Sequence, residues 1–182
     1  TPAALAGLKP KDIHALAIGT TREAVTVGDA FNLKGTAVAK LRFIGQRAGG
    51  MDQLKGLKIV HVYHDSDYGR ETLPLLDHQA AHYGFAVQHL AVQPPGLDQK
   101  ATWLRVKVAQ PDWVILRSAG AMTPTALKEA AQVGFPRDKI VGPHPTCAEH
   151  DIVAAGAAAI GFICATWWGT GTHLPLIQDL VT

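Results

Sequence analysis

The stretch KIVHVYHDSDYG, residues 58–69, decides the fold. Its first half is apolar and rich in β-branched residues, which predicts a buried strand, and its second half is polar, which predicts a loop. Similar short apolar runs recur at residues 14–18, 85–92, 112–116, 139–141 and 160–165. From Ile59 to Lys139 these runs begin about 27 residues apart, which is the length of one strand followed by one helix.

The segments between the strands carry helical patterns. One apolar face recurs at three- and four-residue intervals and ends at Gly84, which suits a left-handed helix terminus; it consists of Leu73, Leu76, Ala80 and Tyr83. A second helix is predicted to begin with Thr123 as its N-cap and Pro124 in its first turn. A third, marked by Val38, Leu41 and Ile44, precedes Gly49. Strands alternating with helices predict an α/β fold, a parallel sheet with helices on both faces.

Composition excludes several functional classes. The 182 residues carry a formal net charge of +2, and their scattered lysines and arginines argue against binding to nucleic acid. No apolar run approaches the roughly 20 residues of a membrane span. Residues 1–12 lack the basic start and apolar core of a signal peptide, so we expect neither membrane insertion nor a signal segment in this chain.

Motifs for cofactor chemistry are missing from the sequence. No G-x-G-x-x-G or G-x-x-x-x-G-K-[ST] loop follows a predicted strand, and no G-x-S-x-G elbow occurs. Two cysteines, Cys147 and Cys164, fit neither a zinc-ribbon nor a thioredoxin spacing. They are predicted to be two buried thiols in preference to one disulfide, which would require an oxidising compartment.

Ligands of open parallel sheets bind at the carboxyl ends of the strands. The loops at those ends are rich in glycine and small polar residues, and they comprise residues 19–21, 64–68, 117–120 and 143–146. Each loop, taken alone, is better explained as an ordinary turn. Trp167 and Trp168 follow the last strand, where they could line a pocket or pack in a core.

Two clusters contain metal-ligand residue types. Asp65 and Asp67 follow a strand, where paired carboxylates could hold a divalent cation; the alternative is that one caps the next helix and Asp65 accepts backbone N–H bonds. His144, Cys147 and His150 lie close together in the sequence, but their spacing fits no standard zinc motif. We therefore predict no metal site and no cofactor.

Three segments resemble the substrate-binding proteins of branched-chain amino acid ABC transporters. They are LKGLKIVHVYHDSDYGRETLPLL (54–76), DWVILRSAGAMTPTALKEAAQVGFPRDKIVGP (112–143) and HALAIGTTREAVT (14–26). The first follows the family pattern K-x-V/I-A-x-V/I-x-x-D-x-x-Y-G. The resemblance implies a type I periplasmic binding fold, in which a small solute is held between two hinged lobes and passed to a membrane permease. It further implies a periplasmic or lipid-anchored extracytoplasmic protein that performs no chemical step and is not an enzyme.

The resemblance also divides the chain. Residues 1–31 resemble the tail of the first lobe, residues 32–166 a nearly complete second lobe, and residues 167–182 a segment that crosses back to the first lobe. The opening strands of the family's first lobe have no counterpart here. The chain is therefore expected to be a fragment that contains mostly one lobe of two.

Site residues follow from the same resemblance. Gly19, Thr20 and Thr21 match the loop whose backbone N–H groups and hydroxyl hold a ligand carboxylate. Tyr68 matches the aromatic residue that reaches into the cleft, although its ring could instead pack on the lobe with its hydroxyl in solvent. Ser118 and Ala119 match the loop that covers the ligand side chain.

His144 matches the position at which amino-acid binders often place an acidic residue for the ligand ammonium. An imidazole pairs poorly with an ammonium group. This favours a carboxylate without an α-amino group, or a neutral amide, unless Glu149 supplies the missing charge. Two other functions stay open: the sensor domain of a receptor with the same lobes, and a metal-dependent enzyme that uses Asp65, Asp67 and the His144 loop.

Overall fold

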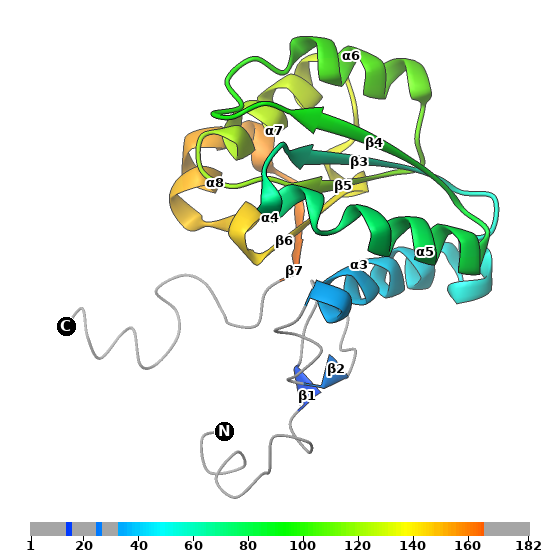
Figure 1. Ribbon diagram of the computed structural model, residues 1–182. Helices are drawn as coiled ribbons and strands as arrows, with labels where there is room; N and C mark the ends of the chain where they lie inside the picture. The colour runs from blue at the N-terminus through cyan, green and yellow to red at the C-terminus, as the bar shows by residue number, and fades with distance from the viewer. Residues whose placement is uncertain (1–13, 16–24, 27–32, 166–182) are drawn as a thin grey trace, which may run out of the picture.

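The computed structural model describes residues 14–15, 25–26 and 33–165 (Figure 1). Its main sheet contains five parallel strands in the order β4-β3-β5-β6-β7. The strands are β3 (Lys58–His64), β4 (Ala86–Val92), β5 (Trp113–Arg117), β6 (Ile140–Pro143) and β7 (Ile163–Ala165). Two short strands, β1 (His14–Ala15) and β2 (Val25–Thr26), pair antiparallel in a separate sheet.

Helices cover both faces of the main sheet, as Figure 1 shows. On one face lie α3 (Leu33–Ala48) and α5 (Leu73–Tyr83), and on the other lie α6 (Lys100–Ala109), α7 (Met122–Gln132) and α8 (Glu149–Ala155). The short pieces are α4 (Asp67–Arg70), η2 (Met51–Leu54), η3 (Arg137–Lys139), η4 (His144–Cys147) and η5 (Gly156–Ala159). The predicted parallel sheet between two helical layers is confirmed.

Side-chain alternation along the strands creates two hydrophobic clusters. Trp113 and Ile115 of β5 pack against α3 and α5, whereas Val114 and Leu116 pack against α6 and α7. All four are buried, because a central parallel strand is covered on both faces. The α5 helix ends as predicted at Gly84, whose φ of 74° is readily adopted by glycine alone.

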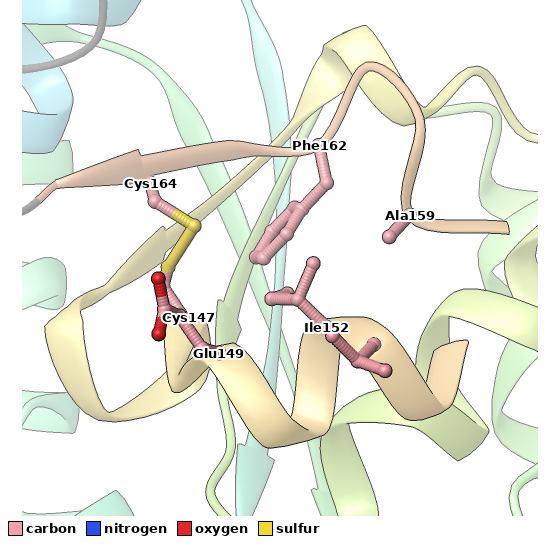
Figure 2. A pocket seen from close by; sticks show the side chains of 7 residues that line it. Cys147, Glu149, Ile152, Ala159, Phe162 and Cys164 are labelled. Atoms are coloured by element: carbon pink, nitrogen blue, oxygen red, sulfur yellow. A yellow bond between two sulfur atoms is a disulfide. The ribbon is translucent and has the colours of Figure 1, made fainter. Parts of the chain in front are cut away.

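A disulfide joins Cys147 to Cys164, so the prediction of two free buried thiols is wrong (Figure 2). Cys164 lies on β7 and pairs with Gly142 of β6, and Cys147 follows β6 in η4. Parallel pairing of β6 with β7 therefore brings the two Cα atoms to 6.0 Å, within the range that a disulfide spans. The sequence spacing alone did not reveal this pairing of strands.

Polar side chains are buried on the sheet face that α3 covers. Lys40 and His61 are almost completely inaccessible, and Arg117 lies close enough to influence the pKa of both. The Nδ1 atoms of His61 and His89 are 3.0 Å apart, and the Thr72 hydroxyl lies 3.4 Å from the other His61 ring nitrogen. Burial, followed by the Lys40 charge, lowers the pKa of His61 well below its ordinary value, so its ring is neutral at pH 7.

The buried amine of Lys40 should make stability depend on pH. Burial, with a smaller contribution from the Arg117 charge, lowers the pKa of Lys40 from 10.5 to about 7. Between these two values the unfolded chain binds the proton and the native state does not, so the free energy of unfolding rises with pH. Urea unfolding of the full-length protein at pH 7, 8 and 9 should give a slope of up to about 1.4 kcal/mol per pH unit from this residue. Lys40→Met should flatten that slope, while Lys128→Met on the exposed side of α7 should leave it unchanged; an unaltered slope in Lys40→Met would contradict the assignment.

The disulfide should contribute measurably to stability. It closes a loop with a sequence separation of 17 residues, for which restriction of the unfolded chain stabilises the native state by about 3 kcal/mol. The double variant Cys147→Ser/Cys164→Ser of the full-length protein should lose about that much in urea unfolding. Reductant should destabilise the wild type and leave the double variant unaffected. Titration of two free thiols in the native, unreduced protein would show that the bond does not form.

Candidate functional site

The carboxyl ends of the parallel strands meet at one edge of the sheet. In Figure 1 the arrowheads of β3 and β4 point to the side where α4 lies. Five polar or aromatic residues follow the ends of β3, β5 and β6 and contact one another there. This group, the edge cluster, comprises Tyr68, Arg117, Ser118, Thr123 and Thr146.

Thr146 holds two loops of this edge together. Its hydroxyl donates to the carbonyl oxygen of Ser118 (2.7 Å) and accepts from the Ser118 N–H (3.1 Å). The Ser118 hydroxyl in turn lies 2.8 Å from the hydroxyl of Thr123. The loop after β5, the η4 turn and the start of α7 are thus joined through buried hydroxyl groups.

Two sequence-based expectations change here. Thr123 is not an N-cap: α7 begins at Met122, and the Thr123 hydroxyl turns inward to Ser118 because that partner is buried beside it. Thr146 was not predicted as a site residue, since a threonine between a proline and a cysteine carries no recognisable pattern. Its contribution depends on contacts about thirty residues away in the sequence.

Tyr68 lies on α4 with its ring against Arg117, whose guanidinium carbon is 4.0 Å from the ring centroid. The Tyr68 hydroxyl is buried and makes no hydrogen bond of normal geometry within the described residues. Burial raises the pKa of Tyr68, while the Arg117 charge and the Thr146 hydroxyl oppose the rise. The expectation that this hydroxyl could face solvent is therefore wrong, because the ring lies within the edge cluster.

Gly69, the last residue of the Y-G pair, lets α4 approach the end of β3. A Cβ atom built on Gly69 would lie 1.9 Å from the carbonyl oxygen of His64, far inside van der Waals contact. Any other residue would force α4 away from the strand. Close packing thus requires glycine at this position of the motif. The short distance between α4 and β3 also fixes the position of the neighbouring Tyr68 backbone relative to the sheet.

Asp65 is engaged by side chains, not by the backbone N–H groups that we expected. Its carboxylate accepts a hydrogen bond from Arg70 Nε at 2.7 Å and another from Gln93. The Arg70 contact lowers the pKa of Asp65. Ser66 occupies the N-cap position of α4, and neither aspartate caps the helix.

His144 opens the η4 turn and is partly buried; this burial lowers its pKa below the usual value. Ala119, in the loop after β5, is exposed. Gly19, Thr20 and Thr21 lie outside the described residues, as do Trp167 and Trp168. Their place in the site is therefore still a prediction.

The metal-ligand residue types do not converge in the part of the chain that the structure describes. Within those ranges, no three His, Cys, Asp or Glu residues are placed to share one ion. The Cys147 sulfur is bonded to Cys164, so it offers no thiolate to a metal beside His144 or His150. The same described residues contain no helix of the length and apolar character needed to cross a bilayer.

A separate cavity of about 540 Å³ adjoins the disulfide (Figure 2). Ile152 and Phe162 form its apolar walls, and Glu149 lies on its border beside the two sulfurs. Its lining contains none of the edge-cluster residues, and Ile152 and Phe162 pack on the sheet face that α6 and α7 cover, so the cavity is distinct from the edge cluster.

Comparisons with known proteins agree with this architecture. The family model for the periplasmic binding protein matches residues 6–182. A crystal structure described as an ABC transporter permease from the Pseudomonas fluorescens group shares 43% identity, with a TM-score of 0.73, over 78% of this chain and 34% of that one. A branched-chain amino acid ABC transporter from Thermus thermophilus with bound valine shares 28% identity, with a TM-score of 0.62, over 79% and 36% of the two chains.

A solute-binding protein of an ABC transporter from R. palustris, in complex with benzoate, has a TM-score of 0.57 at 23% identity over 78% of this chain and 39% of that chain. A search of curated proteins found no match. The present chain spans about a third of the length of the first of these structures, at 34%. The family match, which extends over residues 6–182, decides the assignment: this chain belongs to the periplasmic binding protein family.

Proposed function

We propose that the chain forms the greater part of the second lobe of a solute-binding protein that serves an ABC importer. In this proposal residues 1–31 end the first lobe, residues 32–166 form the second and residues 167–182 cross back. The closed, solute-loaded protein delivers its ligand to a membrane permease without a chemical step. The observation that carries the proposal is the family match, and the polar edge cluster supports it by occupying the sheet edge where open α/β folds bind ligands.

The proposed ligand contacts come from both lobes. Gly19, Thr20 and Thr21 are proposed to hold the ligand from the first lobe. From the second lobe we propose Tyr68, Ser118, Ala119 and His144. The Tyr68 side chain is partly exposed although its hydroxyl is buried, so its ring is proposed to contact the solute.

The charges near these residues favour an acid that lacks an α-amino group. Asp65 is paired with Arg70, and Glu71 is paired with the buried Arg117. Two of the three carboxylates that follow β3 are thus paired with arginines and are poor partners for an ammonium group, while the third, Asp67, lies exposed on α4. His144, whose pKa is lowered by burial, contributes a neutral ring at pH 7, so it adds no negative charge either.

The disulfide supports an extracytoplasmic location. Disulfides persist in oxidising compartments such as the periplasm and are rare in the cytosol. A periplasmic or lipid-anchored protein would meet that condition, and it is where an importer's binding protein operates.

Paired ligands can test the function and the ligand class together. The full-length protein should be titrated calorimetrically with isovalerate against valine, isocaproate against leucine, and hydrocinnamate against phenylalanine, since each pair differs by one amino group. We expect at least one acid to bind more tightly than its amino-acid partner and to stabilise the protein by about 2.7 kcal/mol at a hundredfold excess over Kd. Tyr68→Leu should weaken binding of that acid about tenfold because the ring contact is lost, and Tyr83→Leu at the end of α5 should not.

Two results would count against the proposal. If no panel member binds, the proposed class of solute is wrong. If the protein converts a panel member into a product, or is purified with a tightly bound transition metal in stoichiometric amount, an enzyme is favoured. Tighter binding of the amino acid in every pair would leave the transport function standing and would overturn the argument from charge.

A further inference from the structure

Arg117 contacts both the main chain and the ring of Tyr68. It is the last residue of β5, and it is only 4% exposed. Its Nε donates a hydrogen bond to the carbonyl oxygen of Tyr68 at 2.6 Å, and its guanidinium lies over the Tyr68 ring with the central carbon 4.0 Å from the ring centroid. A terminal nitrogen pairs with Glu71. One buried side chain therefore holds α4 by three different contacts.

The α4 helix is also held at Gly69, which packs on the His64 carbonyl and accepts a hydrogen bond from the buried Thr72 hydroxyl at 2.8 Å, but these contacts do not reach the Tyr68 ring. The helix is four residues long, and no side chain caps its start at Ser66. A helix of one turn is unstable in isolation, so its geometry depends on contacts with the rest of the lobe. The Arg70–Asp65 pair on the same turn is solvent-accessible at the arginine, and exposed pairs of this kind contribute little. The buried contacts of Arg117 are therefore the stronger constraint on Tyr68.

We propose that Arg117 is the positioning residue of the ligand site, because it sets the orientation of the partly exposed Tyr68 ring that is proposed to meet the solute. The inference rests on the proposed function. Arg117 itself does not touch the solute: its guanidinium is committed to the Tyr68 carbonyl, the Tyr68 ring and Glu71. A lysine could keep the charge, but it could not stack as a plane on the ring while donating in two other directions. Lysine or arginine at position 117 could pair with Glu71, but only arginine has the geometry to make all three contacts.

The substitution Arg117→Lys tests this in the full-length protein. Affinity for the tightest acid of the panel should fall about tenfold, and the side-chain NMR signals of Tyr68 should shift. In a Tyr68→Leu background the same substitution should cost little further affinity, because the ring that Arg117 positions is gone. The matched control Arg70→Lys, on the same helical turn, should preserve both the affinity and the Tyr68 signals.

The outcomes separate the two proposals. If the wild type binds and Arg117→Lys binds equally well, or if Arg117→Lys costs as much in the Tyr68→Leu background, the positioning role is overturned and the transport function stands. If the wild type binds no panel member, the proposed solute class fails and the positioning role for that solute fails with it. Should Arg117→Lys not fold, Glu71→Gln keeps the arginine and removes its carboxylate partner: a severalfold loss of affinity with shifted Tyr68 signals supports the role, and wild-type affinity overturns it.

Discussion

Parallel pairing of five strands is the constraint on which the rest of this structure depends. Because β3, β5 and β6 run in the same direction, their carboxyl ends deliver Tyr68, Arg117 and Thr146 to one edge. The same pairing sets β6 beside β7 and so permits the disulfide. An antiparallel arrangement of the same segments would send alternate loops to opposite edges and would separate every contact of the edge cluster.

Burying the polar residues beneath this edge costs folding free energy. Lys40, His61 and Arg117 occupy positions on a sheet face that Leu41, Ile44 and Ile115 otherwise make apolar. Buried charges are rarely the most stable solution for a core, and isosteric apolar residues often stabilise such positions. Of the three, Arg117 lies at the carboxyl end of its strand and contacts the Tyr68 helix, which associates this buried charge with the edge cluster.

The parts of the fold that depend on local patterns were predictable from sequence. The strands at residues 58–64 and 113–117 are continuous apolar runs, and Gly84 ends α5 through its own backbone freedom. The α6 helix was not predicted, because Trp103 and Val106 are interleaved with exposed apolar residues such as Val108 that blur the periodicity. The α8 helix, at seven residues, is too short to show a period.

The site was predictable only in outline. The loops that carry Tyr68, Ser118 and His144 were identified from their place after strands. Arg117 and Thr146 lie within two of those loops but were not singled out as site residues, because their roles come from partners that lie far apart in sequence. The disulfide was misjudged for the same reason, since a pairing of two cysteines is a property of neighbouring strands and not of spacing.

The disulfide also has a mechanical consequence. β7 is an edge strand of three residues, and a tensile load on the chain beyond Ala165 would act on it by peeling, which breaks hydrogen bonds one at a time. Cys164 is the penultimate residue of that strand and is covalently tied to Cys147. Peeling can therefore advance no further than one residue before the load passes through the sulfurs into η4. A force applied at this end of the lobe therefore displaces the turn that contains His144, and it does not separate β7 further from the sheet.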